Sequence, residues 1–84
     1  REVSDGLVRQ TSLREQLEAQ RALVASLEAS HKLSELRYRE GLDGYLGVLV
    51  SQRSLYGAQQ GLVATRLAAQ ANRVVLFKAL GGRL

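Results

Sequence analysis

One short stretch near the middle of the chain interrupts an otherwise continuous helical pattern, and it constrains what the rest can form. Residues 37–46 read RYREGLDGYL. Gly41 can adopt the left-handed conformation that ends a helix, and Leu42 after it can fold back onto Leu36. Asp43 can accept a backbone N–H from the first turn of a following helix. We therefore expect a tight turn over residues 40–43 that joins two antiparallel helices.

The segment before the turn, about residues 2–39, has the pattern of an amphipathic helix. One side carries residues that recur mostly at helical spacing, namely Leu13, Leu17, Val24, Leu27, His31 and Tyr38. Ser12 and Glu15 have the spacing of a capping box, so either a new helix begins there or a continuous helix bends near residues 10–12. No alternating or β-branched run favours a strand.

The segment after the turn, about residues 44–80, has the clearest repeat. Apolar doublets recur in a seven-residue frame at Val48-Leu49, Leu55-Tyr56, Leu62-Val63 and Leu76-Phe77. Such a repeat faces one partner continuously only if the helices form a left-handed supercoil. Two adjacent apolar columns are wider than a two-stranded seam needs, which indicates two neighbours. Leu80-Gly81-Gly82 predicts a glycine-terminated end.

These patterns predict an all-α fold in which residues 1–84 form a single antiparallel two-helix hairpin, or coiled coil. Two helices cannot enclose a core, so much of the broad apolar surface stays in contact with water. We expect the chain to be an excised part of a larger assembly, such as a bundle or a wall of helices. In isolation it should self-associate, most simply into a four-helix bundle.

The net charge of +4 comes from the second half of the chain. Residues 41–84 carry one acid, Asp43, against five cations: Arg53, Arg66, Arg73, Lys78 and Arg83. A basic half can indicate a nucleic-acid surface. However, these cations are spread along the predicted helix and do not cluster, which favours a solvated or lumen-facing polar stripe and no nucleic-acid partner.

Nothing in the sequence suggests catalytic chemistry. His31 is the only histidine, and cysteine is absent, whereas a zinc site needs three or four ligands. The serines and threonines lack a partner base. Residues 41–44 lack the lysine and the length of a phosphate-binding loop. We therefore expect a protein that is not an enzyme, with no catalytic, cofactor-binding or metal-binding residues, and His31 as a packing residue.

Residues 37–82 resemble the C-terminal periplasmic hairpin of the outer-membrane efflux channel proteins, the TolC/OprM/NodT family. The opening EVSDGL at 2–7 and EQLEAQ at 15–20 resemble the descending helix of the same hairpin, so the resemblance covers the whole chain. The matching positions in the second part are Arg37, Tyr38, Gly41, Leu46, Val48, Leu49, Gln52, Arg53, Leu55, Ala58, Gln59, Asn72, Val74, Leu76, Lys78, Ala79, Leu80, Gly81 and Gly82.

The resemblance implies a function for the parent protein. It implies a homotrimeric channel in the outer membrane of a Gram-negative cell, with this segment in the periplasm and the membrane contact made by other parts. The channel would export drugs, metals or other solutes together with a periplasmic adaptor and an inner-membrane pump.

The resemblance also assigns two candidate sites. The adaptor-docking tip would comprise Arg39, Gly41, Leu42, Asp43, Gly44, Tyr45 and Leu46. Tunnel-lining or groove positions would be Gln52, Arg53, Gln59 and Gln60. The chain departs from the family at Val50, where the family usually has Asp, so an acidic constriction is not expected in this hairpin.

Two other classes are compatible with the residues alone. One is a coiled-coil arm that binds RNA through the basic second helix, which would bind less tightly as salt rises. The other is a structural hairpin with no transport role.

Overall fold

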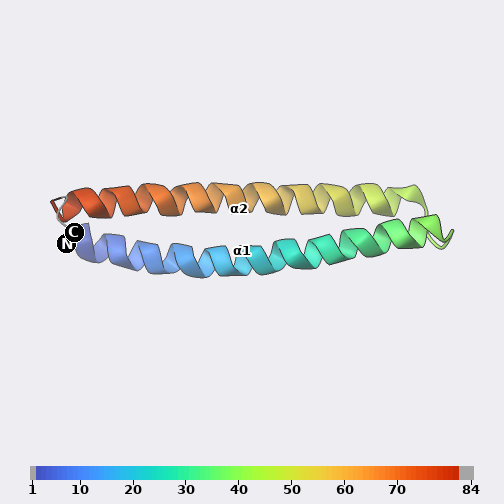
Figure 1. Cartoon of the computed structure of the whole chain (residues 1–84), viewed down its shortest axis with the longest axis horizontal. Helices are drawn as coiled ribbons and strands as arrows, with labels where there is room; N and C mark the ends of the chain where they lie inside the picture. The colour runs from blue at the N-terminus through green and yellow to red at the C-terminus, as the bar shows by residue number, and fades with distance from the viewer. Residues whose placement is uncertain (1, 82–84) are drawn as a thin grey trace.

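The computed structural model describes residues 2–81, which form two long helices side by side. Helix α1 spans Glu2–Arg39 and helix α2 spans Tyr45–Ala79. Figure 1 shows them running antiparallel along their whole length, with the turn at one end and the start of α1 and the end of α2 at the other. The hairpin measures 61 × 18 × 14 Å. The predicted all-α hairpin fold is therefore confirmed.

Helix α1 is continuous through the region where a new start or a bend was considered. The Thr11 hydroxyl donates to the Leu7 carbonyl at 3.1 Å, so this polar side chain is accommodated within the helix. Helix α2 begins at Tyr45 because Gly44 is still extended, with φ −78° and ψ 169°. At the other end the Leu80 N–H bonds to the Leu76 carbonyl, and Gly81 has φ 79°. Gly82 lies outside the described residues.

The two helices meet along one seam. Its members alternate in steps of three and four residues on both helices, which is the coiled-coil repeat. On α1 the seam comprises Val3, Gly6, Gln10, Leu13, Leu17, Gln20, Val24, Leu27, His31 and Ser34. On α2 it comprises Val48, Ser51, Leu55, Ala58, Leu62, Thr65, Ala69, Asn72, Leu76 and Ala79. The seam is the hairpin's only interior within residues 2–81, and it is one layer thick.

The apolar doublets of α2 divide between the seam and the outside. The first member of each doublet lies in the seam, as Val48 and Leu62 do. The second members form an exposed column, defined as Leu49, Tyr56, Val63 and Phe77, whose exposed fractions run from 46% to 63%. This division agrees with the inference that the stripe is wider than one partner helix can cover. Tyr38, expected on the packed side of α1, is instead 45% exposed, because it lies past the last seam residue of α1.

Polar contacts fix the register of the seam. The Asn72 side chain, 6% exposed, donates from Nδ2 to the Gly6 carbonyl at 3.0 Å and to Gln10 Oε1 at 2.9 Å. Near the other end, His31 Nδ1 lies 3.0 Å from Ser51 Oγ. Gln10 and Asn72 are equidistant in sequence from Gly41, and so are His31 and Ser51. One register therefore holds from end to end.

Gly6 allows a close approach of the two helices near the start of α1. A Cβ placed on Gly6 would collide with Cδ2 of Leu76 and would lie 3.1 Å from its Cγ. Because only a hydrogen occupies that position, Leu76 packs directly onto the α1 backbone. The same proximity brings the Gly6 carbonyl within reach of Asn72.

Candidate functional site

The turn at the hairpin tip is closed by backbone hydrogen bonds. The Leu42 N–H donates to the Arg37 carbonyl at 2.8 Å, and the Gly41 N–H donates to the Tyr38 carbonyl at 3.0 Å. These two bonds, with Gly41 at φ 75°, constitute a Schellman motif. Gly41 ends α1 as the sequence predicts, since a side chain is strained at this φ. The tip therefore has a defined backbone shape.

Asp43 does not cap α2, which corrects the expectation from the sequence. Gly44 is the N-cap residue, and no side chain bonds to the first turn of α2. Instead, Asp43 accepts a hydrogen bond and ion pair from Arg37 Nε at 2.5 Å, with Arg37 Nη2 to Asp43 Oδ1 at 3.4 Å. The Gly41 turn carries Asp43 back toward the last turn of α1, where the guanidinium competes successfully for the carboxylate.

The pair shifts the pKa of each group in the direction that favours its charged form. The hydrogen bond from Arg37 lowers the pKa of Asp43, and the same hydrogen bond raises the pKa of Arg37. Both side chains remain accessible to solvent. Arg37 was missing from the predicted tip. The sequence signal that could have found it is a pair of opposite charges on either side of a glycine turn.

Apolar side chains cover much of the rest of the tip and are open to water. Leu42 is 64% exposed and Leu46 is 73% exposed. The expected packing of Leu42 on Leu36 leaves both side chains at least half exposed. Tyr38 and Tyr45 meet across the turn, with ring centroids 5.0 Å apart and planes tilted by 59°. Arg39, Gly41 and Gly44 are exposed beside them, so the structure brings all the predicted tip residues to one end of the rod.

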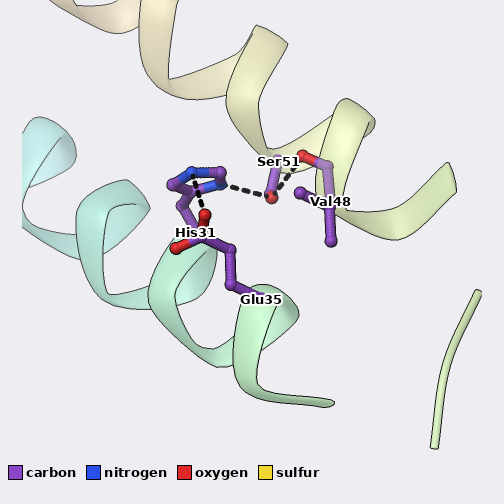
Figure 2. Close-up of polar contacts among 4 residues, drawn as sticks. All are labelled: His31, Glu35, Val48 and Ser51. Atoms are coloured by element: carbon purple, nitrogen blue, oxygen red, sulfur yellow. Dashed lines mark hydrogen bonds and ion pairs between the residues drawn. The ribbon is translucent and has the colours of Figure 1, made fainter. Parts of the chain in front are cut away.

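The first polar contact of the seam above the tip links the two helices through His31 (Figure 2). Ser51 Oγ donates its only proton to the Val48 carbonyl at 2.9 Å, so its oxygen is left to accept from His31. This assigns the imidazole proton to Nδ1. The other ring nitrogen, Nε2, lies 3.7 Å from a Glu35 carboxylate oxygen. His31 is thus a seam residue held by a hydrogen bond to Ser51, as the packing interpretation predicts.

The predicted polar stripe lies along α2 and is separate from the tip. Gln52, Arg53, Gln59 and Gln60 are all exposed and recur at the seven-residue period. They form two columns outside the seam, one on each side of the exposed apolar column. None of them forms a side-chain hydrogen bond or an ion pair to another of the residues 2–81. The structure therefore leaves the stripe free to meet solvent or another surface.

Residues 2–81 contain neither a metal-binding cluster nor a membrane-spanning stretch. No group of three or more His, Cys, Asp or Glu side chains is placed so that it could hold a metal ion. Neither helix contains a stretch long and apolar enough to cross a membrane.

The comparison with known proteins identifies the family. Residues 1–82 match the model of the outer membrane efflux protein family. The chain belongs to this family, whose members are components of efflux transport systems and not enzymes. The resemblance inferred from residues 37–82 is confirmed.

Individual relatives support the same conclusion. The toluene efflux pump outer membrane protein TtgF of Pseudomonas putida is 51% identical over 82 residues, which cover 98% of this chain and 17% of that protein. The cation efflux system protein CusC of Escherichia coli is 38% identical over 82 residues, or 98% of this chain and 18% of that protein. The chain thus spans less than a fifth of the length of these curated relatives.

Proposed function

We propose that this chain is the periplasmic α-helical hairpin of a trimeric outer-membrane channel, and that its tip docks a periplasmic adaptor of an efflux pump. Membership of the outer membrane efflux protein family supports a role in an efflux channel of the outer membrane. The long, narrow shape suits one unit of a helical wall, because the exposed column of α2 needs a further neighbour. Relatives are named for toluene, for antibiotics and for cations, so drugs, metals and other solutes are all proposed cargo classes.

The observation that carries the docking proposal is the combination of a fixed backbone and exposed apolar side chains at the tip. The Schellman turn and the Arg37–Asp43 pair hold the tip in one shape. Leu42 and Leu46 then point apolar surface at solvent with no covering group from residues 2–81. A preformed apolar knob loses little conformational entropy when a partner covers it. The partner in this proposal is a periplasmic adaptor coupled to an inner-membrane pump.

The polar stripe is proposed to line the tunnel or a groove on its outside. Gln52, Arg53, Gln59 and Gln60 are exposed and unpaired within the described hairpin. Amide and guanidinium groups tolerate water on one side of a wall whose other contacts are apolar. We favour this over RNA binding, because the cations of α2 lie on separate turns and form no continuous phosphate-binding track.

The docking proposal is tested by export from a strain that lacks its own outer-membrane channel, complemented with the full-length parent. Leu42→Asp places a charge on the exposed tip and should lower export at least tenfold, because a buried unpaired carboxylate opposes docking. Leu42 is a better target than Gly41, where φ 75° would strain any side chain. Replacing residues 37–46 by a neutral turn should abolish export.

The matched control is Val8→Asp, the same kind of change at a residue that is 69% exposed near the far end of the hairpin. It should leave export and protein level close to wild type. Unchanged export with Leu42→Asp, or equal losses from Leu42→Asp and Val8→Asp at normal protein levels, would show that the tip is not the docking site.

A further inference from the structure

His31 is the only ionisable side chain among the seam residues, and it makes the polar contact of the seam that is nearest the tip. Its side chain is 17% exposed. Histidine is the only side chain that ordinarily changes charge between about pH 5 and 8. A change of charge at this point therefore acts directly on the contact between the two helices.

In the neutral ring the single imidazole proton is used for the contact with α2. Ser51 Oγ donates its own hydrogen to the Val48 carbonyl, so the 3.0 Å bond between His31 Nδ1 and Ser51 Oγ needs the imidazole proton on Nδ1. Nε2 then carries only a lone pair, which faces a Glu35 carboxylate oxygen 3.7 Å away (Figure 2). Two acceptors cannot bond to each other, so neutral His31 has Ser51 as its one hydrogen-bond partner.

A second proton changes the Nε2 side of the ring and leaves the Nδ1 side in place. Nε2–H becomes a donor that faces a carboxylate, and a charge-assisted bond of this kind is about 2.7–2.9 Å long. The Glu35 side chain is 47% exposed and lies one helical turn from His31, so it can move by about 1 Å to make that bond. Nδ1–H still donates to Ser51, and its share of the positive charge strengthens this bond across the seam. Protonated His31 thus has a partner at each nitrogen, one on each helix.

The other charged groups around His31 lie on α1. Glu28 and Glu35 flank it on the same side, three residues before it and four residues after it, and Lys32 is the adjacent cation. Within residues 2–81 Lys32 forms no ion pair with either acid, and Glu28 forms none with His31. The α2 residues that face the ring are uncharged, namely Val48, Ser51 and Leu55. Glu35 is therefore the carboxylate available to a protonated ring, and no charge on the facing side of α2 opposes the contact.

We propose that His31 and Glu35 form a pH-sensitive clamp on the part of the seam that is nearest the tip. In mildly acidic surroundings the ring with both nitrogens protonated binds Glu35 and Ser51 together and holds α1 against α2. In alkaline surroundings only the bond to Ser51 remains. The hairpin next to the tip is therefore held more firmly in mild acid. This inference concerns the hairpin itself and does not depend on whether the tip docks an adaptor.

Urea denaturation followed by circular dichroism tests the clamp, at one chain concentration and at about pH 5.5 and about pH 8. At the lower pH, Glu35→Gln should raise the ratio of unfolded to folded chain about two- to fivefold, because a neutral amide replaces the acceptor of a charge-assisted bond. At the higher pH it should leave the ratio unchanged or lower it, because the amide can donate to the unprotonated Nε2. The pKa of Asp43 is lowered by Arg37, so that ion pair is present at both pH values and does not contribute to the difference.

The matched control is Glu28→Gln, the same change in the same column of α1 at an acid that forms no ion pair with His31. It should have the same small effect at both pH values. A Glu35→Gln effect that does not change with pH, or one that Glu28→Gln reproduces, would overturn the proposal.

The ring gives a second readout, because His31 is the only histidine in the chain. Ring nitrogen chemical shifts measured by NMR should show the Nδ1–H tautomer at about pH 8 and protons on both nitrogens at about pH 5.5. His31→Asn keeps an amide donor for Ser51 but does not titrate, so in this background Glu35→Gln should have the same effect at both pH values. A neutral ring that carries its proton on Nε2, or a pH-dependent Glu35→Gln effect that persists in His31→Asn, would show that these groups do not form the clamp.

Discussion

The ion pair between Arg37 and Asp43 ties the end of α1 to the residues just before α2. It also leaves the first turn of α2 without a side-chain cap, because Asp43 is turned back toward Arg37. Asp43 thus helps to close the loop and does not cap α2. The tip owes its shape to this contact and to the left-handed backbone of Gly41.

The pair predicts a pH dependence of stability. The pKa of Asp43 is lower in the folded chain than in the unfolded chain, so the pair stabilises the fold above the ordinary carboxyl range. That stabilisation is lost as the pH falls through the lowered pKa. Asp43→Asn should therefore unfold at a lower temperature than wild type at pH 7, and the gap should close at strongly acidic pH. Thermal melts at both pH values measure it. A gap that persists unchanged in acid would exclude the ion pair as its cause.

At the scale of the elements, two long helices are held by a seam that is partly polar. Asn72 and Gln10 occupy positions that leucine would fill in a simpler coiled coil, and Gln20 Oε1 is buried without a hydrogen-bond partner in residues 2–81. Polar residues in a seam lower stability but specify register, because a shifted helix would leave them unpaired. The seam is thus better at fixing alignment than at providing stability.

The Asn72 contacts give a prediction at this scale. Asn72→Ala removes two hydrogen bonds, leaves the buried Gly6 carbonyl without its side-chain donor, and should lower the free energy of unfolding by about 1–3 kcal/mol. Gln70→Ala is the control, because Gln70 is exposed two residues earlier and should change it by less than about 0.5 kcal/mol. Urea denaturation of both variants measures the difference. Equal effects would show that the Asn72 contacts contribute nothing specific.

Much of the arrangement of elements follows from sequence patterns. Gly41 ends α1 because its positive φ is accessible to glycine, and the seven-residue repeat of α2 predicts which apolar residues reach the seam. Gly6 and Asn72 were not predicted as contact partners, because a helical glycine and an exposed-type amide give no signal until the register is known. Tyr38 was misassigned for a similar reason: the repeat continues through it, but the partner helix has already ended.

The candidate site was less accessible to such reasoning. The positions of the tip residues follow from the turn, whereas the partner of Asp43 depends on the path of the chain after Gly41. Opposite charges near a turn can pair or can cap a helix, and the sequence does not rank these two outcomes. The side of α2 that carries Gln52 and Gln59 could be predicted from periodicity, because it lies outside the seam.

At the scale of the whole molecule, the hairpin is a rod whose interior is a single seam. Few residues are buried, and large apolar side chains such as Leu67 and Val75 are more than half exposed. A domain of this size with so little interior is marginally stable alone. Association that covers the exposed columns should therefore contribute a substantial part of its stability.

This dependence predicts that thermal stability varies with concentration. If folding is coupled to association, a hundredfold increase in chain concentration should raise the Tm by about 5–10 °C. Circular dichroism melts across that range measure the shift, with sedimentation at the same concentrations. A constant Tm together with a helical monomer at high micromolar concentration would rule out coupled association.

The equal spacing of seam partners from Gly41 also restricts how the length of such a hairpin can vary. Removing one residue from either helix would pair every layer beyond that point with the wrong partner, including Asn72 with Gln10. A layer pattern with a seven-residue period is restored only when both helices lose or gain the same whole number of repeats, at matching distances from the turn. The length of the hairpin can therefore change only in steps of roughly 10 Å, the rise of one seven-residue repeat.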